Sequence, residues 1–228
     1  ITLPDGSVKE FASGVTPMEV AKSISEGFAR NVISASFNGT TVETTTPLTT
    51  DGSLILYTWN DEDGKKAFWH STSHVMAQVL EQMYPGIKLT LGPAIANGFY
   101  YDVDFEEHKI TEADFKKIED RVLEISRGKH EFKLRPVSKA DALELYKDNV
   151  YKTEMITNLE DGTITFCDHD TFTDLCRGGH IPNTGIIKAM KIMSVAGAYW
   201  RGDEKNKQLT RVYGTSFPKQ KDLTEYLA

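Results

Sequence analysis

Two short motifs in the sequence carry residues that could do chemistry together. His70 and His74 lie one helical turn apart in HSTSH, so on a helix both imidazoles project from one side. Cys176 and His180 lie four residues apart in DLCRGGH, across two glycines that permit a tight turn. Three imidazoles and one thiol form a tetrahedral zinc ligand set by type, and imidazoles are also the commonest acid–base catalysts.

Neither motif is specific alone, because a histidine pair on a polar helix face or a cysteine near a histidine is more often structural than functional. Their occurrence together in one half of the chain favours a joint site. The HExxH glutamate of zinc proteases is absent, since Thr72 and Ser73 fill the middle of HSTSH, and this excludes that class. Cys167 and Cys176 are the only cysteines, too few for a disulfide framework.

The sequence patterns around these motifs predict helices and strands that make an α+β fold in the second half of the chain. Hydrophobic periodicity predicts a helix over 70–84, and capping residues open two more helices over 111–127 and 138–147. Strand-like runs cover the remaining apolar segments, at 97–105, 151–156, 163–166, 186–198 and 209–213.

The first 60 residues predict a separate, small β-grasp unit. Thr16 and Pro17 open a helix, and Asn38-Gly39 is a typical hairpin dipeptide between two strands. Strands are also expected on either side of the Pro4-Asp5-Gly6 turn and over 53–59. The charged segment 60–66 predicts a linker, which divides the chain into a domain at 1–60 and a larger domain at 61–228.

Charge is distributed unevenly along the chain. The net charge is 26 − 33 = −7, but residues 177–228 hold 9 basic and 4 acidic residues, or +5, which leaves −12 for residues 1–176. Such a basic end permits a polyanionic partner, although charged surfaces are usually only solvated. Aromatic and basic residues alternate there, and they are candidates for guiding single-stranded RNA: Tyr199, Trp200, Arg201, Lys205, Lys207 and Arg211. Trp200 suits a core position equally well.

No run in the sequence approaches the roughly 20 apolar residues of a membrane helix. The first residues, ITLPDGSVKE, also lack the basic and apolar regions of a signal peptide. We therefore expect a cytoplasmic chain with no membrane partner.

Four motifs in a fixed order resemble the N-terminal region of bacterial threonyl-tRNA synthetases: HSTSH, GPAIANGFYYDVD, DLCRGGH and SVAGAYWRGDEKNKQLTRVYGTSF. The resemblance covers the whole chain, with 1–60 similar to the TGS (ubiquitin-like) domain and 61–228 to the tRNA editing (second additional) domain. It implies hydrolysis of seryl-tRNA(Thr), bound by its 3′ CCA end, while threonyl-tRNA(Thr) is spared. The chain lacks a class II catalytic signature. We therefore expect no aminoacylation by this chain alone, and expect separate catalytic and anticodon-binding domains in a homodimeric protein.

The resemblance also implies roles for particular residues. His70 is assigned to the terminal ribose and the attacking water, Lys152 to charge stabilisation or proton relay, and Asp174 to the substrate ammonium. The side-chain pocket is assigned to His74, Cys176 and His180, and further substrate contacts to Tyr101, Gly92 and Arg177. Covalent catalysis by Cys176 is not expected, because nothing in the sequence indicates a depressed thiol pKa.

Two questions stay open at this point. The ligand types favour zinc at His70, His74, Cys176 and His180, as in related alanyl editing domains, whereas the closer threonyl resemblance implies a site without a cofactor. Two rival functions also remain. A free-standing, zinc-dependent alanyl/seryl-tRNA trans-editing deacylase would not carry the β-grasp unit, and a non-catalytic RNA-binding regulatory module would bind RNA without turnover.

Overall fold

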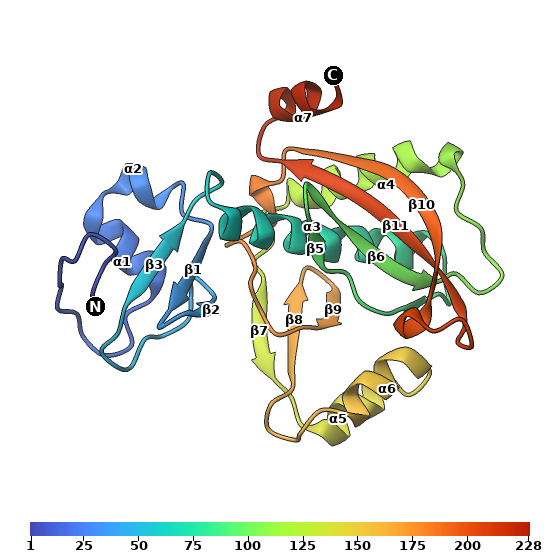
Figure 1. Cartoon of the computed structure of the whole chain (residues 1–228), viewed down its shortest axis with the longest axis horizontal. Coiled ribbons are helices and arrows are strands. Elements are labelled where there is room, and N and C mark those ends of the chain that lie inside the picture. Colours follow the sequence, from blue (N-terminus) through green and yellow to red (C-terminus); the bar gives the residue numbers. More distant parts are fainter.

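The computed structural model describes residues 1–228 and contains three sheets with antiparallel strands (Figure 1). The N-terminal unit has a three-stranded sheet in the order β2-β1-β3. Its elements are α1 (Pro17–Ile24), α2 (Glu26–Ala29), β1 (Ser34–Phe37), β2 (Thr40–Val42) and β3 (Leu54–Tyr57). A small core of Leu3, Val20, Ala35, Leu48 and Leu54 holds it together.

Local signals in this unit are mostly confirmed. The Thr16 side chain accepts a hydrogen bond from the Glu19 amide, and Pro17 occupies the first helical turn. Asn38 and Gly39 both have positive φ, as a hairpin of this type requires. The two strands expected around Pro4-Asp5-Gly6 are wrong, because only isolated bridges form there, from Thr2 to Val8 and to Ser53.

The rest of the chain contains two sheets. The larger has the order β10-β11-β6-β4, with β5 also paired to β6. Its strands are β4 (Lys88–Leu89), β5 (Ala94–Ile95), β6 (Gly98–Asp104), β10 (Ala189–Tyr199) and β11 (Gln208–Phe217). The smaller has the order β7-β8-β9, formed by β7 (Lys133–Pro136), β8 (Thr165–His169) and β9 (Phe172–Leu175).

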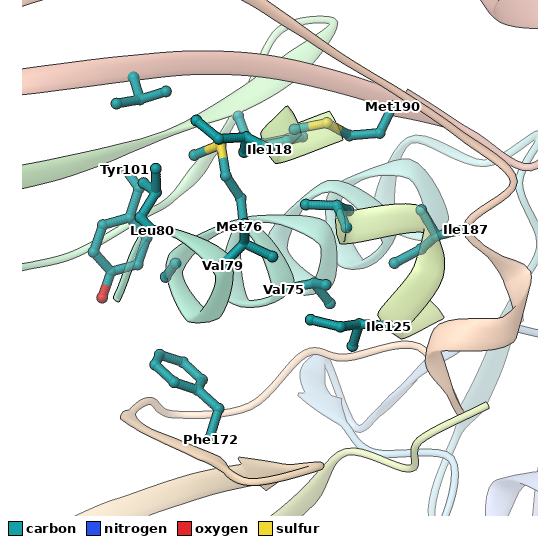
Figure 2. Close-up of a cluster of buried hydrophobic side chains, with 14 of the residues drawn as sticks. Val75, Met76, Val79, Leu80, Tyr101, Ile118, Ile125, Phe172, Ile187 and Met190 are labelled. Atoms are coloured by element: carbon teal, nitrogen blue, oxygen red, sulfur yellow. The ribbon is translucent and has the colours of Figure 1, made fainter. Parts of the chain in front are cut away.

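A long central helix, α3 (Glu62–Met83), lies between these two sheets (Figure 1). Figure 2 shows Met76 and Val79 of this helix between Phe172 on one side and Met190 on the other. The other helices are α4 (Glu112–Ser126), α5 (Lys139–Leu145), α6 (Val150–Thr157) and α7 (Gln220–Leu227), with short 3₁₀ turns at Thr184–Ile186 and Trp200–Gly202. The mixed α+β class is confirmed. No helix of the chain combines the length and apolar character that crossing a bilayer requires.

Two expectations for the larger part of the chain are wrong. Most of the charged segment 60–66 forms the first turns of α3, which begins at Glu62. Asp61 occupies the N-cap position, and its carboxylate accepts a hydrogen bond from the Thr58 amide before the helix. The exposed, polar start of the helix has the composition of a linker. The segment 151–156 is helical rather than extended. The Asn149 side chain accepts hydrogen bonds from the amides of Tyr151 and Lys152, and this N-cap starts a helix where the residue types predicted a strand.

Gly64 marks the closest approach between α3 and the end of the N-terminal unit. A β-carbon at this position would overlap the carbonyl oxygen of Thr58. We expect Gly64→Ala to lower the free energy of unfolding by about 1–3 kcal/mol, measured by urea denaturation, because backbone cannot move aside as a side chain can. Gly27→Ala is the matched control: it is also helical, its nearest neighbour would be 3.7 Å away, and alanine should stabilise it. Equal effects of the two changes would contradict this account.

Candidate functional site

Four side chains from two distant segments converge in the structure: His70, His74, Cys176 and His180, whose ligating atoms all lie within 4.8 Å of one another. The Nε2 atoms of His70 and His74 are 3.1 Å apart. Cys176 Sγ lies 3.5 Å from His70 Nε2 and 3.2 Å from His180 Nε2. The two motifs therefore form one cluster at the junction of α3 and the segment after β9.

Small polar residues allow other segments to approach α3 at this point. Ser71, Thr72 and Ser73 are buried although they lie between the two histidines. Ser71 accepts a hydrogen bond from the amide of Ile181, and Ser73 donates to the carbonyl of Gly92. Larger side chains would push these segments away. The middle of HSTSH is therefore structural, a role that its polarity concealed.

Asp174 lies beside the cluster as a buried carboxylate that accepts hydrogen bonds from several directions. Its Oδ1 is 2.5 Å from Lys152 Nζ and accepts from the Leu175 amide, and its Oδ2 is 2.8 Å from the Tyr101 hydroxyl and 3.1 Å from His74 Nδ1. Burial opposes its ionisation, but the Lys152 ammonium and the His74 ring outweigh burial and hold the pKa of Asp174 well below its usual range.

These four partners use the acceptor capacity of a carboxylate, which is about four lone-pair sites. Asp174 is therefore engaged within the protein and is placed to orient His74. It also lines the cavity described below, and its contact with a substrate ammonium stays a prediction. Lys152 is equally occupied, since its Nζ also donates to the Thr90 carbonyl (2.5 Å) and lies 3.3 Å from the Tyr101 hydroxyl. Both side chains of this pair are buried, and Lys152 reaches the cluster through Asp174.

The histidines of the cluster differ in charge. Burial lowers the pKa of His70, so its imidazole is neutral near neutral pH. Burial also disfavours a charge on His180, but hydrogen bonds to two thiols and a carboxylate hold the pKa of His180 well above its usual value. In the same way, burial is outweighed at Cys176 by the charge of His74 and by histidine hydrogen bonds, and the pKa of Cys176 lies well below its usual value. No residue near Cys176 in the sequence indicates this low pKa, which depends on histidines that the fold brings together. A nucleophilic Cys176 is therefore chemically accessible.

A cavity of about 520 Å³ opens onto the cluster, within the range of small-molecule sites. His70, His74, Asp174 and Cys176 line it, together with the expected contact residues Gly92 and Arg177 and with Arg201, and Lys152 and Tyr101 are not among the residues that line it. Gly92 is required by packing, because a β-carbon there would overlap the Tyr101 ring.

The six aromatic and basic residues of the C-terminal segment do not form one surface: some are exposed, one lines the cavity and two are held by other protein groups. Tyr199, Lys205 and Lys207 are exposed, and Lys207 Nζ lies 3.6 Å from a carboxylate oxygen of Asp104. Arg201 lines the cavity and pairs with Glu154 at 2.9 Å.

Two members of this set are held inside the fold. Trp200 is only 7% exposed, packs on Tyr151 and donates from Nε1 to Glu154, which favours its structural alternative. Arg211 forms a bidentate pair with Asp102, at 2.8 and 2.9 Å. Their side chains are therefore committed to other protein groups.

The donor set fits a zinc ion by type. Three of its donor–donor distances, 3.1–3.5 Å, are close to the edges of a tetrahedron with zinc bonds of roughly 2.0–2.3 Å, which are about 3.3–3.8 Å long, and all four donor atoms lie within 4.8 Å of one another. A deprotonated Cys176 is also the form that a metal binds. His70, His74, Cys176 and His180 would hold the ion.

One buried histidine near the cluster was not singled out from the sequence. His169 on β8 has its Nε2 2.9 Å from the Gln78 side-chain oxygen, and Gln78 in turn donates to Asp170. Burial lowers the pKa of His169 to about 3. Between its unfolded pKa of about 6.5 and this value, the unfolded chain binds a proton that the folded chain does not.

The folded state therefore loses stability as the pH falls through this window, by up to about 1.4 kcal/mol for each pH unit from this group. Urea denaturation at several pH values measures how the free energy of unfolding changes with pH. This pH dependence should be weaker in His169→Phe than in the parent chain, because phenylalanine does not titrate. Identical slopes for the two proteins would refute the assignment.

A second group missed from the sequence is Glu43, which follows β2 in the N-terminal unit. Its carboxylate lies 3.2 Å from His180 Nδ1 although 137 residues separate the two in the chain. No spacing or motif in the sequence connects them, so only the fold could reveal the contact.

Comparisons with known proteins agree with this architecture. The model of the TGS domain matches residues 1–58, and that of the threonyl and alanyl tRNA synthetase second additional domain matches residues 163–213. The chain is 88% identical over its whole length to the threonine--tRNA ligase of Flavobacterium johnsoniae. The chain corresponds to the N-terminal region of a threonine--tRNA ligase.

Other threonine--tRNA ligases show how far the similarity extends. The enzyme of Flavobacterium psychrophilum is 86% identical over the whole chain, and that of Cytophaga hutchinsonii is 53% identical. The chain spans 35–36% of the length of these threonine--tRNA ligases. The His/Cys cluster therefore belongs to a chain with the TGS and editing domains of this enzyme family.

Proposed function

We propose that this chain is the proofreading part of its synthetase and hydrolyses the ester bond of seryl-tRNA(Thr) while sparing threonyl-tRNA(Thr). The observation that carries the proposal is a cavity lined by His70, His74 and Cys176, with the buried His180 in contact with Cys176, in a chain that matches the second additional domain of threonyl and alanyl tRNA synthetases. The proposed units are a TGS domain at 1–60 and an editing domain at 61–228.

The need for such an activity follows from the size of the substrate side chains. A synthetic site for threonine rejects serine only through a missing methyl group, worth about 1–3 kcal/mol or roughly 10- to 200-fold. A second site that fits serine excludes threonine by a clash with the same methyl group. His74 and Cys176 line the cavity, and the buried His180 packs behind Cys176. These three side chains are suited to such a boundary, because a close-packed wall cannot yield to an added methyl.

The residues around the cavity divide the work of ester hydrolysis. His70 is neutral near neutral pH and lines the cavity, so we assign it to the terminal ribose and the attacking water. The buried Lys152–Asp174 pair acts indirectly: Lys152 fixes Asp174, and Asp174 orients the His74 ring. Asp174 is the one carboxylate that lines the cavity, and we assign it to the substrate ammonium as well.

The partner is the 3′ CCA end of tRNA(Thr), and Arg177 and Arg201 at the cavity would contact its phosphates. The rest of the synthetase, as a homodimer with catalytic and anticodon-binding domains, would supply further tRNA affinity. Affinity for the fragment should fall with rising salt, because phosphate contacts release counterions.

The test is hydrolysis of both aminoacyl-tRNAs at saturating substrate, with EDTA in a parallel reaction. Selective loss of serine that survives EDTA supports metal-independent editing. Inhibition that zinc reverses, with one equivalent of zinc in the protein that is lost in His70→Ala, supports the zinc-dependent alternative that the donor spacing allows. RNA binding without turnover supports the non-catalytic module.

Cys176 separates two routes for the same reaction. The water route predicts that Cys176→Ala retains hydrolysis. A covalent route, which the low thiol pKa makes chemically accessible, predicts loss of hydrolysis and a seryl thioester that can be trapped from the parent chain.

A further inference from the structure

The N-terminal unit contributes one side chain to the His/Cys cluster. Glu43 is buried, and it is the residue after β2. One of its oxygens accepts a hydrogen bond from the Gly179 amide at 2.6 Å, and the other lies 3.3 Å from the His180 amide. The first oxygen is also 3.2 Å from His180 Nδ1. Glu43 therefore contacts the turn before His180 and the ring of His180 itself.

The turn between Cys176 and His180 is shaped to receive this carboxylate. Gly178 and Gly179 have φ values of +114° and +90°, a backbone conformation that favours glycine, and the next two amides, of Gly179 and His180, both point at the Glu43 carboxylate. Such an array of amides attracts an anion, and Glu43 is the anion that occupies it. A β-carbon at Gly178 would lie 2.7 Å from the Glu43 carboxylate, so the glycine is needed for the contact.

The ring of His180 is fixed from its other sides as well. Phe132 stacks on it at a centroid distance of 5.3 Å, and His70 stacks on it at 4.9 Å. Its Nε2 faces Cys176 Sγ, while Nδ1 faces Glu43 and, at 3.7 Å, the sulfur of Cys167. Cys167 is a weak acceptor, so the carboxylate is the partner that determines which way the ring is turned.

We propose that Glu43 is a positioning residue of the editing site: its carboxylate orients His180 and the Gly178-Gly179 turn, so that the N-terminal unit completes the site of the larger unit. This inference rests on the proposed editing function for its kinetic consequence, but the orientation of His180 is observable without any turnover. It gives the N-terminal unit a role inside the site in addition to any binding role of its own.

The test compares Glu43→Ala and Glu43→Gln in the whole chain. We expect a downfield Hδ1 proton signal of His180 in the parent chain, because its N–H is held by a carboxylate away from solvent. The signal should be lost in Glu43→Ala and shifted in Glu43→Gln, which retains an acceptor of the same shape but no charge. With seryl-tRNA(Thr), kcat should fall about 10- to 100-fold in Glu43→Ala and less in Glu43→Gln, with KM changed little.

Glu10→Ala is the matched control, since Glu10 is an exposed acid of the same unit that lines a different cavity. It should alter neither the proton signal nor kcat. If the parent chain shows no hydrolysis, the proposed function fails, yet the proton signal still decides the position of Glu43. An unchanged signal in Glu43→Gln and Glu43→Ala, with both proteins folded, would overturn the inference.

A second pair of variants tests the contact from the opposite side. Gly178→Ala and Gly179→Ala both place alanine at a positive φ, so their backbone strain is similar. Only Gly178→Ala would press on Glu43, whereas the β-carbon at Gly179 would meet Thr41 at an ordinary 3.6 Å. The His180 signal should change more in Gly178→Ala, and equal changes in the two would argue against the carboxylate as its cause.

Discussion

Asp174→Asn is expected to lower the free energy of unfolding by about 3–5 kcal/mol, because it leaves the Lys152 ammonium buried without a counter-charge. Both side chains are almost fully buried, and their charged atoms are 2.5 Å apart. Removing one partner of such a pair costs far more than the pair itself contributes. Urea denaturation at neutral pH measures the change.

The double variant Lys152→Met/Asp174→Asn separates this cause from loss of packing. It should lower the free energy of unfolding by less than the sum of the two single changes, since it leaves no buried charge without a partner. The exposed pair of Lys116 and Asp120 is the control, and Lys116→Ala should have little effect. Additive costs for the buried pair would contradict the explanation.

The pH dependence of this pair has a definite sign. The pKa of Asp174 is lower in the folded chain than in the unfolded chain. Its stabilising contribution is therefore complete above the unfolded pKa, which is about 3.9, and is lost as the pH falls toward the folded value. The parent chain should lose this contribution in acid, and the double variant should not.

His70→Ala is expected to reduce hydrolysis of seryl-tRNA(Thr) by about 10²- to 10⁴-fold, the usual contribution of a positioned acid or base. Stability should change far less than activity: the ring loses its contacts with His74, Cys176 and His180, but His70 is partly exposed at the cavity and alanine is the better helix former. Single-turnover hydrolysis with excess protein measures the chemical step. Partial recovery with added imidazole would tie the loss to the missing ring.

His108→Ala serves as the control for this change, because His108 lies outside the cavity, with its ring 2.9 Å from the Pro85 carbonyl. It should hydrolyse seryl-tRNA(Thr) at the parent rate. A rate for His70→Ala within a few-fold of the parent chain would remove His70 from the reaction and move attention to the Cys176 thiolate.

The sequence predicted those features of the site that depend on neighbouring residues, but not the contacts between distant segments. HSTSH predicts two imidazoles on one helix face, and two glycines before His180 predict a tight turn, because both inferences depend on neighbours in the chain. The pairing of Lys152 with Asp174 depends on where α6 docks. The strand-like run over 151–156 even predicted the wrong element there, since the Asn149 side chain caps a helix at this position.

Contacts between residues far apart in the chain had no signal in the sequence. Glu43 is one of many acidic residues in a negatively charged segment, and nothing in its neighbours distinguishes it. Trp200 shows why its two alternatives stayed open in the sequence: an aromatic residue among basic ones resembles a stacking surface, while its burial depends on Tyr151 from another element. The charge state of Cys176 likewise depends on histidines that only the fold assembles.

The central helix also determines the order in which the site can form. Trp69 and Thr72 on α3 hydrogen-bond to Ser216 on β11, and the first of these bonds spans 147 residues. On a growing polypeptide, the helix that carries both histidines emerges long before the strand that holds it. Non-local contacts of this kind form late and slowly. During synthesis the two histidines are therefore present before the residues that complete their cluster, Cys176 and His180, and before the strand that holds the helix.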